Sequence, residues 1–492
     1  MPPYNSINLH PSSFGPSDLS LHTYDVIFIG SGWPANVGAA RVTQAGMKPV
    51  IVESELIGGD CPYWACIPSK ALLRPGEALQ DAKSVPGIAI TNGLDADAVF
   101  RGRDSWTGDW DDQVLIPSIG GDDADFVRGH GKVVGVKKVR VENTNGESVT
   151  LEARQAVVIC TGSEPVIPNI PGLADANPWI PRQATSTSQV PKNLVILGAG
   201  AVGCEMATIF ANLGGKVSLI SSTKELLPRT DPEAGALVRQ SLVDLGVEMY
   251  LSAEVTGVQR KRDGTLEVQL KHGSVIHATE ILISTGRRPR VKDIGLEQLG
   301  IAVNGSRIPV DESLCVGLES GEWLYAAGDV NGRAMMSHTA KYHARVVVNA
   351  IIARKTGAKP TITEWGSLSA TADKYAVPQV VFTRPTVASV GLTRQAAEAA
   401  GRSFREVTAP LKTEGAELRA IGYKDGWAQW IVDAESGQLL GATFVGDDAA
   451  DLLHASTVAI VGGLTIARLA HAIPSFPTMS EVYLNLIEAA GF

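Results

Sequence analysis

The stretch YDVIFIGSGWPANVGAARVTQAGMKPVIVE, residues 24–53, follows the order strand, glycine turn, helix, strand and acidic residue. Its apolar run VIFI is typical of a buried parallel strand. Gly30 permits a tight turn, Gly32 lets the backbone approach a pyrophosphate, and the third glycine position holds Ala35. Glu53 ends the second strand, where a carboxylate can accept hydrogen bonds from ribose hydroxyls. This order predicts a dinucleotide-binding βαβ unit.

The same pattern recurs at residues 194–220, where the glycine positions are Gly198, Gly200 and Gly203. Each unit is followed by an apolar strand that ends in Thr-Gly, which gives the pairs Thr161–Gly162 and Thr285–Gly286. A further apolar strand, in WLYAAGDV, places Asp329 where a carboxylate can meet a sugar-like chain. Two such units predict two cofactors, and a flavin with a nicotinamide is the economical pairing.

The end of the second strand in the second unit bears on which nicotinamide is bound. A carboxylate there favours NAD, because it binds the 2′-hydroxyl and repels a 2′-phosphate. This chain has Ser221, Ser222, Thr223 and Lys224 instead. Hydroxyls and an ammonium can accept a phosphate, so the pattern favours NADPH, with NADH possible because no arginine clamp is present. The alternative is a polar turn that binds nothing.

Length and composition limit the remaining possibilities. At 492 residues the chain is too long for one core, so two or three domains are expected. The net charge of -9 argues against a nucleic-acid partner, and no run of about 18 apolar residues suggests a membrane span. Five cysteines fit a reducing compartment, and we expect a cytoplasmic protein. The Pro- and Ser-rich residues 1–23 are expected to form a disordered tail.

A second decisive stretch, GGDCPYWACIPSKALL at residues 58–73, places Cys61 and Cys66 five positions apart. In a regular helix that separation is about 7.5 Å along the axis, whereas a disulfide needs Cα atoms within about 7 Å. A bridge therefore requires a distorted first turn, which Pro62 and Pro68 would favour. The alternative is a pair of inert core thiols. The other cysteines occur singly in apolar segments and are expected in the core: Cys160, Cys204 and Cys315.

This stretch resembles the active-site helix of the flavin-dependent pyridine nucleotide-disulfide oxidoreductases, the group of dihydrolipoamide dehydrogenase, glutathione reductase and mercuric reductase. The resemblance runs from about residue 24 to the C-terminus. Its further landmarks are, in order, RGHGKV from 128, TGRRP from 285, MMSHTA from 335 and FTRPTVASVGLT from 382.

The resemblance implies a role for each matching residue. Cys66 would face the flavin as the charge-transfer thiolate, and Cys61 would be the interchange thiol that meets the substrate. Lys70 and Glu205 would pair beside the flavin N5. With the motifs above, the candidate FAD residues are Gly30, Gly32, Ala35, Glu53, Gly59, Asp60, Lys70, His130, Gly131, Thr161, Gly162, Asp329 and Ser337. The candidate nicotinamide residues are Gly198, Gly200, Gly203, Glu205, Ser221, Ser222, Thr223, Lys224, Gly286 and Arg287. No metal site is expected.

One element departs from the family pattern. Disulfide reductases of the family end in His-Pro-Thr-x-x-Glu, supplied by the partner subunit, whose histidine moves protons at the interchange thiol. Here Pro477, Thr478 and the catalytic candidate Glu481 fit, but Phe476 stands in the histidine position. General acid–base help is worth about 100- to 10,000-fold, so this change argues against efficient reduction of a small disulfide. His471 could substitute only if the loop were rearranged, and a surface role for it is favoured.

These observations favour an NADPH-dependent FAD oxidoreductase that passes electrons, with or without a Cys61–Cys66 disulfide, to a quinone-like or other small acceptor. Tyr63 and Trp64 could stack such an acceptor, although core packing explains them equally well. The alternatives are a disulfide reductase with an unusual proton donor and a flavoprotein that serves only as a binding partner.

The expected architecture is α/β, with two Rossmann-like dinucleotide-binding domains and an α+β C-terminal dimerisation domain. Residues 24–170 and 300–360 would form the FAD domain, 171–299 the NAD(P) domain and 361–492 the interface domain of a homodimer.

Overall fold

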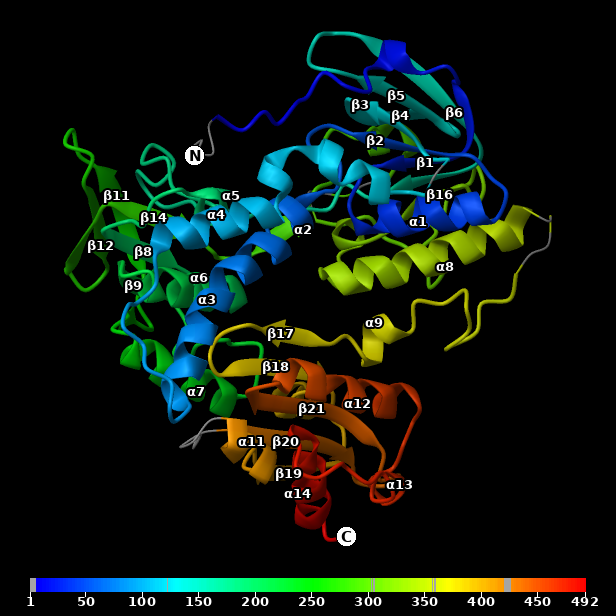
Figure 1. Ribbon diagram of the computed structural model, residues 1–492. Helices are drawn as coiled ribbons and strands as arrows, with labels where there is room; N and C mark the ends of the chain where they lie inside the picture. The colour runs from blue at the N-terminus through cyan, green and yellow to red at the C-terminus, as the bar shows by residue number, and fades with distance from the viewer. Residues whose placement is uncertain are drawn as a thin grey trace.

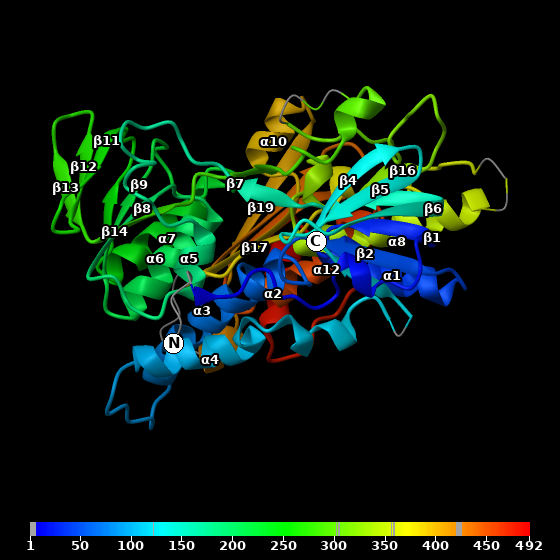
Figure 2. The same ribbon diagram turned by 90° about the horizontal axis from the view of Figure 1, so that it is seen from above.

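Two sheets built around parallel strands and one antiparallel sheet organise the chain (Figure 1). The computed structural model describes residues 6–121, 123–301, 303, 306–355, 357, 360–419 and 426–492. Seen from above, the two sheets built around parallel strands lie toward opposite ends of the molecule, with α2 (Asp60–Tyr63) and α3 (Cys66–Ser84) between them (Figure 2). The two cysteines therefore lie where the two units meet.

The first sheet is built around the opening βαβ unit. Its strands in spatial order are β3 (Asp125–Arg128), β2 (Pro49–Glu53), β1 (Thr23–Ile29), β6 (Ser148–Ile159), β5 (Lys138–Glu142) and β4 (His130–Gly135), and β16 (Leu324–Ala326) also pairs with β6. Strand β1 is parallel to both of its neighbours, whereas β4 and β5 form an antiparallel hairpin. The parallel strands end on the same side, so their loops meet at one edge.

Alternate residues of β1 pack on opposite faces of this sheet, as a strand buried on both sides requires. Val26 and Phe28 pack in a core shared with α1 (Trp33–Gln44) and α8 (Ser337–Lys355). Ile27 packs toward the hairpin in a second core. The helices α1 and α8 lie side by side beneath the sheet (Figure 1).

The second sheet repeats this arrangement. Its strands are β10 (Glu248–Tyr250), β9 (Lys216–Ile220), β8 (Asn193–Leu197) and β14 (Glu280–Ile283), all parallel. Leu194 and Ile196 pack against α6 (Ala201–Asn212) and α7 (Pro232–Asp244). Val195 packs on the other face, against a three-stranded sheet of β11 (Val255–Arg260), β12 (Leu266–Leu270) and β13 (Val275–Ala278). Strands β7 (Ser163–Pro165) and β15 (Arg287–Pro289) pair where the chain passes between the two units.

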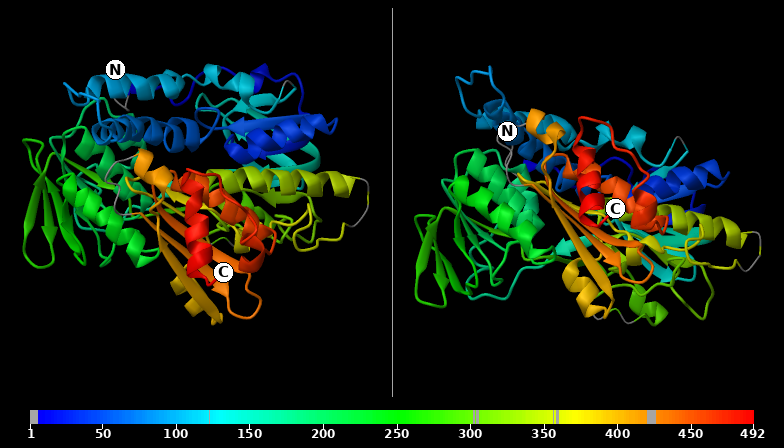
Figure 3. Two further views of the ribbon diagram at one scale, coloured as in Figure 1. Left: turned by 60° about the horizontal axis from the view of Figure 1, so that its bottom comes forward. Right: turned by 90° about the horizontal axis from the view of Figure 1, so that it is seen from below.

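The C-terminal unit is an antiparallel sheet with helices. Its strands in order are β17 (Gln379–Val381), β18 (Thr386–Gly391), β21 (Leu439–Gly446), β20 (Trp427–Asp433) and β19 (Phe404–Pro410). Helices α12 (Ala449–Val461) and α14 (Val482–Ala489) pack on it (Figure 3). The remaining helices are α4 (Ala96–Trp106), α5 (Pro181–Ser186), α9 (Ala372–Tyr375), α10 (Arg394–Ala399), α11 (Glu414–Arg419) and α13 (Ile466–Leu469). None of the helices in the described ranges has both the length and the apolar character needed to cross a bilayer.

The prediction of a disordered N-terminal tail is wrong for residues 6–22. The backbone N–H of Arg128 donates to the carbonyl oxygen of Phe14 at 2.7 Å, and the Arg128 guanidinium donates to that of Ser13. Ile7 and Leu9 pack against a cluster of buried aromatic side chains. These apolar side chains, scattered among Pro and Ser, order the segment because the body of the protein offers them a surface.

The buried ion pair of Arg128 and Asp112 holds this segment in place. Arg128 Nη2 lies 2.9 Å from Asp112 Oδ2, and the side chains are 5% and 0% exposed. Replacing Arg128 with Met leaves a buried carboxylate unpaired, so we expect urea unfolding to show a loss of about 3–5 kcal/mol. The matched control is Arg140→Met, because Arg140 and Glu142 are also 2.9 Å apart but about half exposed. An equal loss in both variants would contradict this account, since an exposed pair contributes about 0–1 kcal/mol.

Candidate active site

The helix start that carries the cysteines is broken, as the five-residue spacing requires. Helix α2 ends at Tyr63, and α3 begins only at Cys66. Between them Ala65 adopts non-helical angles, φ -126° and ψ -98°. Both thiols are free in the structure, and the Cys66 thiol hydrogen-bonds to the Cys61 sulfur. The chain therefore brings together two sulfur atoms that a continuous helix would keep apart.

The two thiols differ in acidity. The hydrogen bond from Cys66 is the largest influence on Cys61 and, against the effect of burial, lowers its pKa to about 6. The same hydrogen bond, together with burial, raises the pKa of Cys66. Ser337, at the start of α8, has its Oγ 3.1 Å from Cys66 Sγ. Within the reduced pair the negative charge falls on Cys61, the thiol to which the resemblance gives the interchange role.

Lys70 and Glu205 form the predicted ion pair between α3 and α6. Lys70 Nζ lies 2.8 Å from Glu205 Oε2, and the glutamate side chain is 7% exposed. Glu205 Oε1 accepts the backbone N–H of Phe382 at 3.0 Å, and Lys70 Nζ lies 4.6 Å from the centre of the Phe382 ring. Phe382 follows β17, so the pair joins both nucleotide-binding units to the C-terminal unit. A cavity of about 720 Å³ with Leu73 and Trp106 in its lining opens beside Lys70 and Phe382.

The first glycine turn fits a pyrophosphate by the test of steric room. Gly30 has φ +100°, and a Cβ there would collide with the carbonyl of Cys160. Gly59 also adopts a positive φ and packs directly against Gly32. A Cβ added to Gly59 would lie only 2.8 Å from Gly32 Cα. Ala35 is buried in the following helix. The turn therefore excludes side chains where a cofactor's phosphates would need the backbone.

Glu53 and Asp329 lie at the ends of their strands, as predicted. Glu53 Oε2 accepts from the N–H and hydroxyl of Ser31, at 2.9 and 2.6 Å. Asp329 Oδ2 accepts from the Ser163 hydroxyl at 2.6 Å. Burial raises the pKa of Asp329, which the Ser163 hydrogen bond partly offsets. Both carboxylates are thus fixed in orientation at the edge where the parallel strands end.

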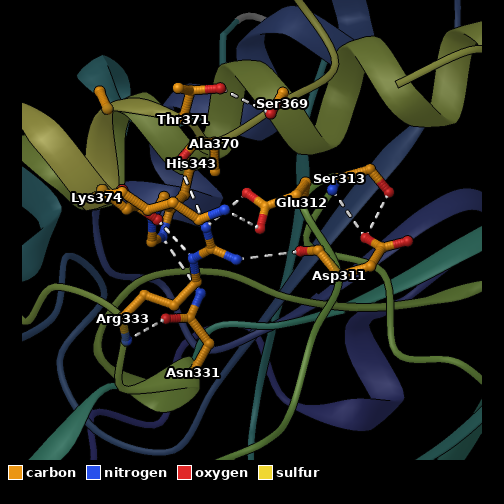
Figure 4. A network of polar contacts seen from close by, with 12 residues as sticks. Asp311, Glu312, Ser313, Asn331, Arg333, His343, Ser369, Ala370, Thr371 and Lys374 are labelled. Carbon is orange, nitrogen blue, oxygen red and sulfur yellow. Dashed lines mark hydrogen bonds and ion pairs between the residues drawn. The ribbon is translucent and has the colours of Figure 1, made fainter. Parts of the chain in front are cut away.

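A buried polar network holds the turn that carries Asp329 (Figure 4). The N–H of Gly328 donates to His343 Nδ1 at 3.0 Å, so His343 Nε2 donates to Asp373 Oδ2, 2.8 Å away. Arg333 adds a second ion pair to Asp373, at 2.8 Å, and one to Glu312, at 2.9 Å. Since Asp373 belongs to α9, this network ties the Asp329 turn to the segment that leads into the C-terminal unit.

Arg287, which the sequence interpretation gave to the nicotinamide, forms its ion pair with Asp60. Its Nη2 lies 2.7 Å from Asp60 Oδ2 and 2.8 Å from the carbonyl oxygen of Ser163, beside Asp329. Arg182 holds the other carboxylate oxygen of Asp60 at 2.7 Å. Burial acts to raise the pKa of Asp60, but the charges of Arg182 and Arg287 outweigh it and hold that pKa below its usual range. The assignment of Arg287 to the nicotinamide stays a prediction, and no sequence motif identified Arg182.

The other flavin candidates occupy the same edge of the sheet or its flank. His130 Nε2 lies 2.6 Å from the carbonyl oxygen of Asp293. Gly131 packs closely on Ile29, which a Cβ would approach to 3.0 Å. Thr161 Oγ1 donates to the carbonyl of Arg290 at 2.6 Å, and Gly162 adopts φ +72°.

The second glycine turn has the same steric character. Gly198 has φ +114°, where a Cβ would lie 2.6 Å from the Ser284 carbonyl oxygen, and a Cβ at Gly203 would collide with the carbonyl of Gly198. Gly200 has open space around it, and Gly286 adopts φ +128°. These residues fit a second pyrophosphate.

The polar residues after β9 separate into two kinds. The Ser221 and Thr223 hydroxyls lie 2.7 Å apart, and Thr223 Oγ1 donates to the carbonyl of Glu225, so these two stabilise the turn itself. Ser222 and Lys224 are exposed. Only the latter two point out of the turn with groups that a phosphate could use.

The segment 471–481, which holds Phe476 and Glu481, makes its hydrogen bonds within the C-terminal unit. Glu481 Oε2 accepts the N–H of Thr478 at 3.2 Å and so caps a short turn. Phe476 and Ile473 are 72% and 92% exposed. His471 is exposed as well. Among the hydrogen bonds of the described residues, those of this segment lead to the C-terminal unit, including one from Thr413 to Thr478.

Two other expectations are decided by burial. Tyr63 and Trp64 are 0% and 2% exposed and pack with Trp110, so they are core residues and offer no stacking surface. The three single cysteines are buried as predicted: Cys160, Cys204 and Cys315. Burial raises the pKa of each of these thiols, which makes them unreactive.

Comparison with known proteins agrees with this geometry. The family model of the pyridine nucleotide-disulphide oxidoreductases matches residues 24–344, and the model of their dimerisation domain matches residues 377–487. The chain belongs to this family. It is 31% identical to a dihydrolipoyl dehydrogenase of Thermus scotoductus over 95% of this chain and 98% of that protein. It is 28% identical to a mercuric reductase of Lysinibacillus sphaericus over 93% of this chain and 81% of that protein.

Solved structures share the fold. A Cu(II) complex of the HOCl-induced flavoprotein disulfide reductase RclA from Escherichia coli superposes with a TM-score of 0.81 at 24% identity, covering 95% of this chain and 99% of that one. LpdA from Mycobacterium tuberculosis gives 0.78 at 22% identity, covering 94% of this chain and 98% of that one. The predicted α/β class, with dinucleotide-binding units and a dimerisation domain, is confirmed. The family consists of enzymes that use FAD and pyridine nucleotides.

The hydrogen bond between the thiols predicts an unusual reactivity for Cys61. We expect its alkylation by iodoacetamide, followed by peptide mass mapping, to reach half its maximal rate near pH 6. In Cys66→Ala the donor is lost, so the midpoint should rise toward the value of about 8.5 for an ordinary cysteine. Cys204 serves as the internal control and should stay unmodified until the protein unfolds. A Cys61 midpoint that Cys66→Ala leaves unchanged would contradict the assignment.

Proposed function

We propose that this protein is an NADPH-dependent FAD oxidoreductase whose Cys61–Cys66 pair passes electrons to a small disulfide. The observation that carries the proposal is the break between α2 and α3, which brings the free thiols of Cys61 and Cys66 together at the start of α3. The lowered pKa of Cys61 supports it. FAD, when bound at the first glycine turn, would supply the two-electron chemistry that links a nicotinamide to the cysteine pair. Gly30, Gly32 and Asp329 would hold it, because they combine a backbone free of side chains with a fixed carboxylate.

The protein's own charges prepare the region around the pair. Lys70 presents an ammonium at the start of α3, and the buried Glu205 fixes its position. Because Glu205 is also held by the N–H of Phe382, neither partner can turn away without leaving a buried charge unpaired. An ammonium in this place favours the gain of negative charge by a neighbouring group.

Thiol–disulfide exchange at Cys61 balances without further reagents. The Cys61 thiolate attacks one sulfur of the substrate, the substrate S–S bond breaks, and the departing thiolate takes a proton from water. Cys66 then loses its proton and attacks Cys61, which releases the second thiol and forms the Cys61–Cys66 bond. Two electrons have left the cysteine pair for the substrate. Tyr63 and Trp64 are buried, so these two rings do not offer a stacking surface to a quinone-like acceptor.

A quinone-like acceptor is the second candidate, and Phe476 favours it. This exposed ring stands where the disulfide reductases of the family have their proton-transferring histidine, and it cannot carry a proton. Reduction of such an acceptor at the flavin would need neither that histidine nor Cys61.

We further assign the cofactors and contacts to segments of the chain. Residues 24–170 with 300–360 would bind FAD, and residues 171–299 would bind NADPH. Residues 361–492 would form the interface of a homodimer, and the exposed Ile473 and Phe476 are suited to burial against a second copy.

Removal of Cys61 separates the two acceptors. In Cys61→Ser, anaerobic NADPH oxidation with a small disulfide such as cystine should fall at least about 1,000-fold, because the attacking thiolate is gone. Turnover with a soluble benzoquinone should remain within about two-fold of the native protein if the flavin serves it directly. Cys204→Ser is the control and should retain both activities. Disulfide turnover that survives in Cys61→Ser would refute the proposal. With both cysteines present, Phe476→His should increase disulfide turnover.

The choice of NADPH depends on Lys224. Lys224→Ala should raise the KM for NADPH about ten-fold, because an exposed ammonium beside the 2′-phosphate is lost, and should leave the KM for NADH unchanged. Steady-state kinetics with both nucleotides measure this. Lys192→Ala is a control for a general change in charge. Equal effects on the two nucleotides would show that Lys224 does not bind the 2′-phosphate.

A further inference from the structure

The first two turns of α8 face the cysteine pair. Ser337 begins the helix with its hydroxyl 3.1 Å from Cys66 Sγ. Lys341 follows four residues later and therefore lies on the same face of the helix, one turn on. The Lys341 side chain therefore leaves α8 on the face that Ser337 presents to Cys66.

Trp33 fixes where the Lys341 ammonium lies. Lys341 Nζ is 3.6 Å from the centre of the Trp33 ring, a short cation–π contact. Trp33 opens α1 directly after the glycine turn. Its indole Nε1 is buried without a hydrogen-bond partner among the described residues, and the indole acts to lower the pKa of Cys61. Trp33 therefore holds the lysine with its ring and lies near the Cys61 thiol.

We propose that Lys341, held over Trp33, is the cation that stabilises the Cys61 thiolate during thiol–disulfide exchange. This inference rests on the function proposed above. Lys341 would give the Cys61 sulfur a positive partner from the same chain. The C-terminal element of a second copy would supply none, because Phe476 occupies the position of the histidine. Lys341 keeps its proton throughout, so the departing thiol still takes its proton from water.

The other basic groups nearby are committed elsewhere. The charge of Lys70 acts on Cys66 and is held by Glu205. His338 Nε2 lies 2.8 Å from the carbonyl oxygen of Pro378. Arg345, one turn beyond Lys341, stacks on Tyr342 at 5.7 Å. The charge of Lys341 acts to lower the pKa of Cys61, although the interaction with Cys66 is the largest influence on that pKa.

The test measures the ionisation of Cys61 apart from turnover. In holoenzyme reduced by a small thiol, the rate of Cys61 alkylation by iodoacetamide is followed against pH for Lys341→Met, Lys341→Arg and Arg345→Met. We expect Lys341→Met to raise the midpoint so that the rate near pH 6 falls about three- to ten-fold. Lys341→Arg should restore the native profile, because it keeps a cation over Trp33.

Arg345→Met is the matched control, since it removes a cation from the same helix without removing the contact to Trp33, and it should leave the profile unchanged. An unchanged profile in Lys341→Met, or an equal shift in Arg345→Met, would overturn the inference.

The outcome is separable from that of the proposed function. A shifted midpoint in Lys341→Met together with no turnover of any small disulfide by the native protein would refute the disulfide reductase and support the role of Lys341 at the thiol. Disulfide turnover by the native protein with an unshifted midpoint in Lys341→Met would support the disulfide reductase and refute the role of Lys341.

Discussion

The close approach of Gly59 to Gly32 is the contact on which the site depends. A Cβ at Gly59 would lie 2.8 Å from Gly32 Cα, so the two segments can meet only backbone to backbone. This contact sets the start of α2, and with it Cys61, against the turn between β1 and α1. Trp33, the first residue of α1, is then near the Cys61 sulfur. The Gly59–Gly32 contact therefore keeps side chains out of the glycine turn and, at the same time, sets the position of Cys61.

The site also depends on charges that are buried in pairs. Lys70–Glu205 joins α3 to α6, Asp60 is held between Arg182 and Arg287, and Asp373 joins His343 to Arg333. A buried pair adds little net stability, but loss of one partner is costly. Such pairs therefore fix the relative positions of the segments they join. In this protein each of them joins segments that lie far apart in the sequence.

The sequence allowed the prediction of features whose chemistry is local. A glycine turn between a strand and a helix, a carboxylate at a strand end, and two cysteines separated by a helix distortion each follow from neighbouring residues. The Lys70–Glu205 pair, 135 positions apart, was predicted only through resemblance to a family. Arg182 lies in a short helix without a motif, and Arg287 follows a Thr-Gly that resembles a nucleotide-binding element. Their contacts with Asp60 depend on the packing of distant segments, which no local pattern encodes.

The error about the tail has the same origin. A Pro- and Ser-rich segment does not fold alone, and Ile7, Leu9 and Phe14 are too few to form a core. They are ordered because Arg128 and the aromatic cluster around Trp110 are already in place. The composition of a segment describes what it can do by itself and omits what the rest of the protein offers.

The presence of Phe476 separates two tasks that one imidazole performs in the disulfide reductases of the family. A thiolate needs a favourable charge nearby in order to exist at neutral pH, and a departing thiolate needs a proton. An ammonium such as that of Lys341 can serve the first need without moving a proton, because its charge acts through space. The second need is modest when the departing thiol is acidic, since it then leaves as a stable anion. A site built in this way should favour disulfides of acidic thiols, so the chemistry of the leaving group would take over part of what the histidine does elsewhere.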